Sequence, residues 1–363
     1  MRSPARTQEP GRRLAVALVV VLVPLLVAPA LSGCLSIERT GWAYSVTQID
    51  ELESKGLTGK GVIVGIIDTG IDPDHPSLDH IDIVAWRDYV GNQEKPYDDS
   101  GHGTHIAGII AARGGGGDWF SGADLEGVAP AVKLIVVKAC GAEECSVAGV
   151  KDGIAWAAAQ GADIITLSLG GRQTFLNLGD ESIQAVQNAA KQGVYVVAAA
   201  GNAGDDHGDV ESPSSARLAI AVGAVDKRLQ VADFSSRGSQ SSNQGTSTPL
   251  GGVGGREDPH KKPELVAPGV DILSAWKGGQ YAEASGTSQA APFVAGTLAL
   301  LLEAHPEWKR SGSRNDGESS VTTMKSVLTK SAKTLEGQRT PHDNAAGYGL
   351  LQAERALERL KAA

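Results

Sequence analysis

The sequence predicts one α/β domain in which a mostly parallel sheet lies between two layers of helices, a three-layer α/β/α arrangement. Four short, continuous apolar runs are typical of strands buried on both faces of a parallel sheet. Alanine-rich stretches with helical periodicity lie between these runs, and no internal repeat or second domain is visible. A chain of 363 residues, 41% of them hydrophobic, is long enough to bury such a core.

The elements are expected in alternating order along the chain. The expected strands are 62–67, 134–137, 164–167 and 194–198. Helices are expected at 147–160 and 181–192, each followed by a glycine that suits a helix C-terminus, and two more helical patterns begin near Ile106 and Gln289. Residues 239–261, rich in Ser, Gly and Gln, break this alternation and indicate a surface insertion.

The first 33 residues have the pattern of an export signal. Four arginines precede an apolar run from Leu14 to Leu31, which ends in Leu31-Ser32-Gly33-Cys34. Small residues before a cysteine resemble a lipoprotein signal, so we expect cleavage before Cys34, lipidation of Cys34, a short tether at 34–41 and a domain at 42–363. An uncleaved signal anchor is the alternative, since 18 apolar residues can just span a bilayer. Both alternatives place the domain outside the cytoplasm, on the outer face of the membrane or secreted.

The charge balance excludes one class of partner. The chain holds 33 Lys and Arg against 42 Asp and Glu, a net charge of −9. Residues 1–33 contain four Arg and one Glu, so their removal leaves 29 basic and 41 acidic residues and a net charge of −12. A protein that binds the phosphate backbone needs a basic face, so we expect no nucleic-acid partner.

Three cysteines are present, and Cys34 is assigned to the signal. Cys140 and Cys145 are too isolated for a structural zinc site, which needs four ligands. In an oxidising compartment a small Cys140–Cys145 disulfide loop is expected, with two free thiols as the alternative.

Three polar segments interrupt the apolar scaffold. Asp68 follows the first strand directly, at the carboxyl end where open α/β sheets bind their ligands. His102 stands between two glycines at the start of a helical pattern. Ser288 begins the small-residue stretch Gln289 to Gly296, at the positive end of a helix.

These segments resemble the signature blocks of subtilisin-like serine proteases, the subtilases. Asp68-Thr69-Gly70, Gly101-His102-Gly103-Thr104-His105 and the stretch GTSQAAPFVAG at 286–296 occur in the family's order, and the resemblance extends from Trp42 to the end of the chain. It implies a serine endopeptidase that acts on proteins or peptides through an acyl-enzyme and needs no cofactor. Ser288 would be the nucleophile, His102 the general base and Asp68 its partner. Asn202 and the Ser288 backbone N–H would form the oxyanion hole, whereas His105 would be structural.

Substrate-binding residues follow from the same resemblance. Ser168, Leu169, Gly170 and Gly171 resemble the edge that pairs with the substrate backbone, and Glu144 with Ser146 falls on the opposing edge. Pro213 corresponds to a family proline that often follows a cis bond. Glu211 corresponds to the floor of the primary specificity pocket, where a carboxylate would favour Lys or Arg. The alternative is that Glu211 points to solvent.

The sequence departs from the family at Gln289, where a methionine usually follows the nucleophile. No metal ligands are assigned. A structural calcium ion is left open, because Asp72, Asp74, Asp205, Asp206 and Asp209 are oxygen ligands only in a generic sense. We predict a monomeric, exported endopeptidase. The alternatives are a catalytically silent subtilase-like binding protein and a lipid-anchored solute-binding protein.

Overall fold

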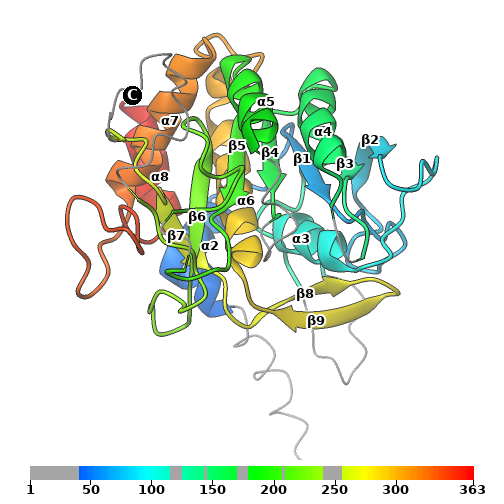
Figure 1. The fold of residues 1–363 in the computed structure, drawn as a ribbon, viewed down its shortest axis with the longest axis horizontal. Coiled ribbons are helices and arrows are strands. Elements are labelled where there is room, and N and C mark those ends of the chain that lie inside the picture. The colour runs from blue at the N-terminus through cyan, green and yellow to red at the C-terminus, as the bar shows by residue number, and fades with distance from the viewer. Residues whose placement is uncertain (1–40, 115–124, 143–144, 170–178, 207–208, 240–255) are drawn as a thin grey trace, which may run out of the picture.

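The computed structural model describes residues 41–114, 125–142, 145–169, 179–206, 209–239 and 256–363. Its centre is a seven-stranded sheet in the order β2-β3-β1-β4-β5-β6-β7, in which every neighbouring pair is parallel (Figure 1). The strands are β1 (Ile63–Asp68), β2 (Asp82–Asp88), β3 (Lys133–Lys138), β4 (Ile164–Leu167), β5 (Tyr195–Ala199), β6 (Ile220–Val225) and β7 (Leu265–Pro268). This arrangement confirms the predicted fold class.

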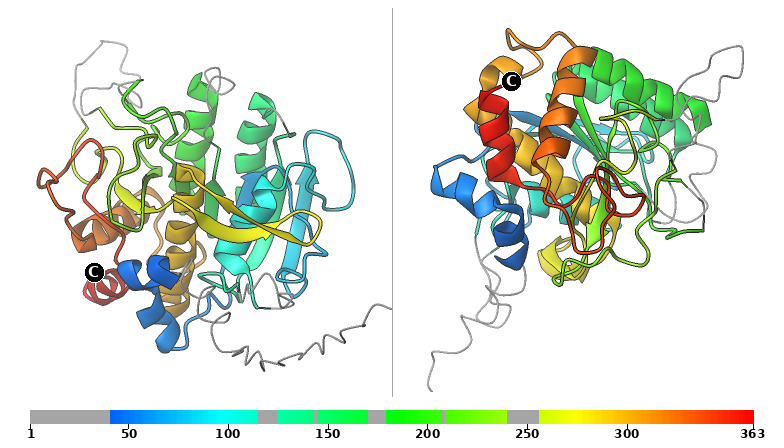
Figure 2. Two further views of the ribbon diagram at one scale, coloured as in Figure 1. Left: turned by 90° about the horizontal axis from the view of Figure 1, so that it is seen from below. Right: turned by 90° about the vertical axis from the view of Figure 1, so that its left-hand side faces the viewer.

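Helices cover both faces of the sheet. Helices α4 (Val147–Ala159) and α5 (Gly179–Lys191) form one layer, and α3 (His102–Ala111) with α6 (Thr287–Ala304) forms the other (Figure 2). The remaining helices are α2 (Ile49–Ser54), η1 (Pro306–Trp308), α7 (Glu318–Ser331) and α8 (Ala353–Lys361), and a hairpin of β8 (Ile272–Trp276) and β9 (Gln280–Ala284) packs on α3.

The strands are apolar on both faces, as their continuous runs predict. In β1, Val64 and Ile66 enter the core shared with α3 and α6, whereas Ile67 enters the core beneath α4 and α5. Strand β1 lies between β3 and β4, where the strand order changes direction. Its carboxyl end is therefore the place where a parallel sheet opens a crevice for a ligand.

The predicted insertion at 239–261 lies partly outside the described residues, but both of its ends are placed. Arg256 Nη1 donates to the Ser239 carbonyl at 2.8 Å and to Asp209 Oδ1 at 2.7 Å, and Arg256 Nη2 reaches Asp209 Oδ2 at 3.0 Å. One buried guanidinium thus ties the two ends of the insertion to a neighbouring loop. The predicted signal peptide, Cys34 and tether fall outside the described residues, apart from Gly41.

In the described part of the chain, no helix combines the length and apolar character that a membrane crossing requires.

Candidate active site

The first pair of the site joins the end of β1 to the start of α3. His102 Nδ1 lies 2.7 Å from Asp68 Oδ1, which also accepts the Thr69 N–H at 2.7 Å. Asp68 is fully buried, whereas 30% of the His102 side chain is exposed. Since a carboxylate can only accept, Nδ1 carries the proton in this pair and Nε2 is left to face a reactant.

Glycine makes this approach sterically feasible. A Cβ on Gly103 would lie 2.1 Å from the Gly70 carbonyl oxygen, and one on Gly70, whose φ is +117°, would lie 1.9 Å from the Tyr97 carbonyl oxygen. A side chain at Gly103 would push the first turn of α3 away from the end of β1, and one at Gly70 would push away the loop that carries Tyr97. The two glycines therefore permit the close contact between Asp68 and His102.

Opposing effects set the protonation of His102. Burial alone would lower the pKa of the imidazole, but the charge and hydrogen bond of Asp68, together with the charge of Asp98, outweigh it. The pKa of His102 therefore lies above the ordinary histidine value. The ring is a stronger proton acceptor than a solvent-exposed histidine would be.

Ser288 is the second residue of α6, and its side chain is almost fully buried. Its hydroxyl donates to the Ser168 carbonyl at 2.9 Å. Helices α3 and α6 pack against each other, which brings His102 and Ser288 to the same end of the sheet. The structure has no direct hydrogen bond between these two described residues. The Ser288 hydroxyl proton is instead bonded to the carbonyl of Ser168, which follows β4.

The Asn202 amide is held in one orientation by α6. Its Oδ1 accepts the Thr287 N–H at 2.9 Å and the Thr287 hydroxyl at 3.1 Å. Since an N–H can only donate, the amide oxygen must face Thr287, and this fixes which end carries Nδ2. A Cβ built on Gly286 would lie 3.4 Å from Asn202 Nδ2 and 3.6 Å from the Ser288 nitrogen. These two nitrogens therefore border the same small space beside Gly286.

Gln289 borders this space too, because its Oε1 would lie 2.8 Å from the same Cβ on Gly286. The side chain is 2% exposed. A glutamine amide thus occupies the position behind Ser288 where the family usually has a thioether.

The predicted substrate residues are only partly placed. Ser168 and Leu169 follow β4 and are buried, but Gly170, Gly171 and Glu144 lie outside the described residues. Ser146 caps α4 by accepting the Gly149 N–H at 3.1 Å. The predicted Cys140–Cys145 disulfide is present.

The Glu211 side chain lies near the site, against the backbone of Gly201. Its side chain packs on Gly201, where an added Cβ would meet Glu211 Cδ at 2.5 Å, and Gly201 directly precedes Asn202. The Ser212–Pro213 peptide is cis, as the resemblance predicted for Pro213.

His105 is structural, as predicted. The ring is fully buried, and Nε2 faces the carbonyl oxygens of Ile272 and Ala282 at 3.1 and 3.0 Å. Burial and the neighbouring charge of His102 lower the pKa of His105 to about 4. His105 therefore anchors α3 to the β8–β9 hairpin as a neutral ring.

Lys138 and Asp98 are the residues near the site that the sequence analysis missed. Lys138 is fully buried beside Asp68 in the sheet register, and its Nζ contacts the Thr69 and Cys140 carbonyls at 2.6 and 3.1 Å and Asp99 Oδ1 at 2.6 Å. A lysine that directly follows an apolar strand was the available signal. Asp98 had a weaker one, since the stretch Asp98-Asp99-Ser100-Gly101 usually indicates only a turn.

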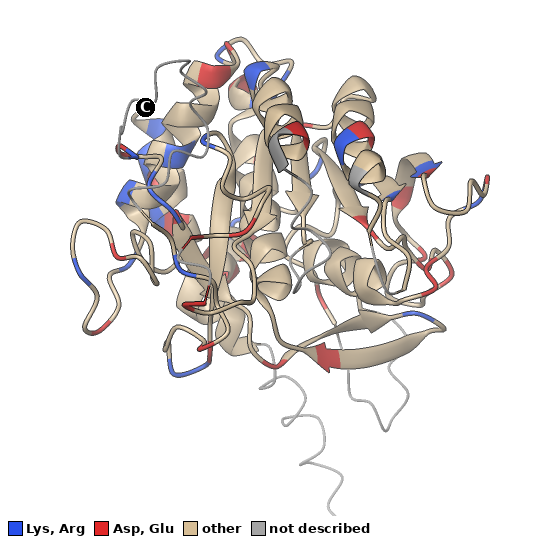
Figure 3. Cartoon of the chain, in the orientation of Figure 1, with Lys and Arg blue, Asp and Glu red and all other residues tan. Residues whose placement is uncertain are grey.

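Three of the five carboxylates considered for calcium have partners within the protein. Asp72 Oδ2 accepts the Gly278 N–H at 2.7 Å, Asp205 pairs with Arg237 at 2.9 Å and Asp209 pairs with Arg256. Within the described ranges, no three His, Cys, Asp or Glu side chains are grouped so that they could hold a metal ion. Figure 3 shows that acidic and basic residues are interspersed along the ribbon.

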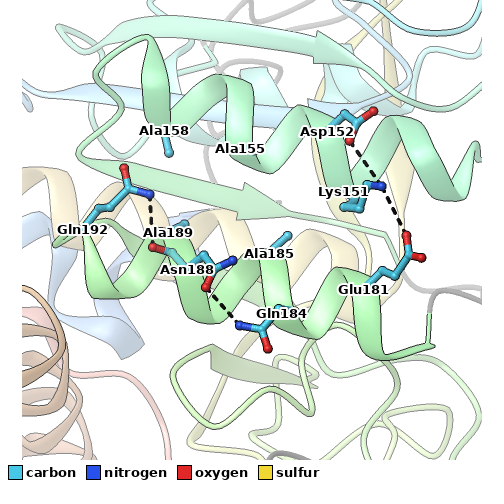
Figure 4. Close-up of a pocket in the computed structure, with 10 residues that line it drawn as sticks. All are labelled: Lys151, Asp152, Ala155, Ala158, Glu181, Gln184, Ala185, Asn188, Ala189 and Gln192. Carbon is cyan, nitrogen blue, oxygen red and sulfur yellow. Dashed lines mark hydrogen bonds and ion pairs between the residues drawn. The ribbon is translucent and has the colours of Figure 1, made fainter.

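A surface groove of about 540 Å³ lies between α4 and α5. Small side chains such as Ala155 and Ala185 line it, and Lys151 pairs with Glu181 at one end (Figure 4). None of the predicted site residues lines this groove.

The site combines a carboxylate–imidazole pair, a serine at the start of a helix and an oriented amide donor at the carboxyl ends of the parallel strands. This combination defines an enzyme of the serine hydrolase class. Residues 59–349 match the subtilase family, peptidase S8. The chain belongs to this family, and it is a subtilisin-like serine endopeptidase.

Curated relatives agree with this assignment. The chain is 34% identical to subtilisin Savinase of Lederbergia lenta over 316 residues, which cover 87% of this chain and 97% of that protein. It is 34% identical to an alkaline protease of Shouchella clausii, covering 87% of this chain and 69% of that protein. It is 36% identical to subtilisin E of Bacillus subtilis strain 168 over 290 residues, covering 77% and 66%.

Proposed function

We propose that Asp68, His102 and Ser288 are the catalytic triad of this endopeptidase. The observation that carries the proposal is the 2.7 Å contact between Asp68 and His102 Nδ1, which leaves Nε2 as the only ring nitrogen able to accept a proton. Ser288 Oγ attacks the scissile carbonyl while Nε2 takes the hydroxyl proton. The imidazolium returns that proton to the leaving amine, and water then hydrolyses the acyl-enzyme through the same base.

Two donors stabilise the oxyanion that forms on the scissile carbonyl. Asn202 Nδ2 and the Ser288 backbone N–H border one space beside Gly286, and α6 directs its positive end toward it. Because the Asn202 oxygen is occupied by Thr287, the amide needs no reorientation when charge develops. The reaction uses amino-acid side chains and water and needs no cofactor.

The substrate backbone pairs with the edge that follows β4, Ser168 to Gly171, opposite Glu144 and Ser146. The hydrogen bond from the Ser288 hydroxyl to the Ser168 carbonyl supports this placement, because it puts the nucleophile directly beside the proposed substrate-binding segment. The Cys140–Cys145 disulfide stiffens the opposing wall, since Cys145 directly precedes Ser146.

Glu211 directs cleavage after Lys or Arg. Its side chain lies against Gly201, next to the oxyanion donor, where it can meet a cationic side chain entering the pocket. A peptide library should show an excess of Lys and Arg before the scissile bond, and Glu211→Gln should remove that excess. Equal cleavage after neutral residues by the wild-type enzyme would refute the assignment.

The enzyme is exported, and Cys34 anchors it to the outer face of the membrane as a monomer. The signal pattern before Cys34 supports this location. Replacing Cys34 with Ser should release the protein from the membrane fraction. A Cys34→Ser protein that stays in the membrane would favour the uncleaved signal anchor instead.

The decisive test of the triad is labelling of the full chain with a fluorophosphonate, followed by mass spectrometry of the modified peptide. We expect one adduct, on Ser288, that is lost in both Ser288→Ala and His102→Ala. A folded protein that takes no label would be a catalytically silent subtilase-like protein, and the proposed triad would be wrong.

A further inference from the structure

Asp98 connects the two elements that carry Asp68 and His102. Its Oδ1 accepts the Thr69 hydroxyl at 2.9 Å and the Ser100 and Gly101 N–H groups at 3.0 and 2.8 Å. Its Oδ2 accepts the Thr104 N–H at 2.9 Å and the Thr104 hydroxyl at 2.7 Å. One carboxylate thus binds the residue after Asp68 and the first turn that begins at His102.

The same contacts cap the N-terminus of α3. Its N-cap residue, Gly101, has no side chain, so the first backbone N–H groups of the helix need acceptors from elsewhere. The Thr69 hydroxyl accepts the Gly103 N–H at 2.8 Å, and Asp98 accepts that of Thr104. Because Thr69 is itself bonded to Asp98, the start of α3 and the end of β1 form one hydrogen-bonded unit.

We propose that Asp98 is a positioning residue for the proposed catalytic pair, and that it acts on His102 through both this hydrogen-bonded unit and its negative charge. The inference deepens the proposed function and rests on it. The unit holds His102 Nδ1 at hydrogen-bond distance from Asp68. The second carboxylate stabilises the imidazolium that forms when Ser288 loses its proton.

The titratable groups around His102 come from several elements. Asp68 faces it from β1, His105 from its own helix, and Asp98 from the preceding loop. Asp99 in that loop is paired with Lys138, and its carbonyl accepts from Lys277 after β8. Helix α6 brings Ser288 and no acidic side chain in its first turn.

The Asp98 carboxyl group is held in its ionised form. Burial would raise the pKa of this carboxyl group, but the hydrogen bonds from Gly101, Thr104 and Thr69 outweigh it and hold the pKa below its ordinary value. Asp98 is therefore negative throughout the range in which His102 titrates.

The test compares Asp98→Asn with a matched control. Asp88 carries the same charge and accepts four hydrogen bonds, from the N–H groups of Val90, Gly91 and Gln93 and from the Tyr97 hydroxyl, so Asp88→Asn removes a similar set of contacts away from His102. The readouts are the NMR titration of the His102 imidazole, made on full chain carrying Ser288→Ala to prevent autolysis, and kcat and KM of the active chain.

We expect Asp98→Asn to lower the His102 pKa and to reduce kcat by about 10- to 100-fold with little change in KM, since small displacements of a catalytic group have effects of this size. Asp88→Asn should leave both unchanged. Thr69→Val, which keeps the Asp98 charge but breaks the unit, should reduce kcat with a smaller shift in the His102 pKa than Asp98→Asn causes.

A folded Asp98→Asn protein with the wild-type His102 titration and kcat would overturn the proposal, as would an equal shift in Asp88→Asn. The titration does not depend on activity. If the wild-type chain is never labelled at Ser288 while Asp98→Asn still lowers the His102 pKa, the result would therefore contradict the triad and not the influence of Asp98 on His102.

Discussion

Replacing Asn202 separates its catalytic role from its structural one, because the two ends of its amide do different work. Nδ2 borders the proposed oxyanion space, whereas Oδ1 accepts two hydrogen bonds from Thr287, a fully buried residue. Asn202→Ala removes both ends. Asn202→Asp keeps an oxygen for Thr287 but replaces the donor with a negatively charged acceptor.

The expected magnitudes differ between the two variants. In subtilisin, loss of the side-chain oxyanion donor lowers kcat by about 10²- to 10³-fold, or roughly 2.7–4 kcal/mol of transition-state stabilisation, and Asn202→Ala should lose a similar factor. It should also lose about 1–3 kcal/mol of unfolding free energy, because the buried Thr287 N–H has no other acceptor among the described residues. Asn202→Asp should lose at least as much kcat and much less stability.

The assay is steady-state hydrolysis of a chromogenic peptide, with unfolding by urea measured on each variant. KM should stay within a fewfold, since the donor acts mainly in the transition state. Asn202→Ala with kcat within threefold of wild type would refute the assignment of the oxyanion hole. Parallel losses of stability in both variants would refute the division between the two ends of the amide.

Two other predictions concern protonation and oxidation. Burial, followed by the charges of Lys325 and Arg217, lowers the pKa of His260 to about 3. His260 binds a proton near pH 6.5 in the unfolded chain but stays neutral down to about pH 3 in the folded chain. The free energy of unfolding should therefore fall as the pH drops from about 6.5 towards 3. His260→Gln should flatten that slope in urea titrations. Peroxide should inactivate the wild-type enzyme more slowly than Gln289→Met, because an amide cannot form a sulfoxide behind the nucleophile; equal rates of loss would contradict this.

The sequence predicted the parts of the fold whose local signals agree with their environment. The expected strands at 62–67 and 164–167 differ from β1 and β4 by one residue or less, and the helix expected at 147–160 matches α4. Strand β2 was missed because it lies at the sheet edge with an alternating, half-exposed pattern. Strand β7 is only four residues long, and its place in the sheet depends on pairing with β6, which no local pattern encodes.

The site was predictable where a motif specifies chemistry and not where contacts depend on folding. Asp68, His102, Ser288 and Asn202 stand in signature segments, and their neighbourhood follows from the parallel sheet. The hydrogen bonds of Asp98 and Lys138 join loops and strands that are distant in sequence, so residue spacing alone cannot predict them.

The ion pair at Arg256 has a consequence for engineering the chain. Because Arg256 joins Ser239 and Asp209, the ends of the intervening segment stay together whatever their separation in sequence. We therefore expect a foreign peptide, epitope or affinity tag inserted between Ser239 and Arg256 to leave these two attachment points in place, provided that the Arg256 guanidinium is kept.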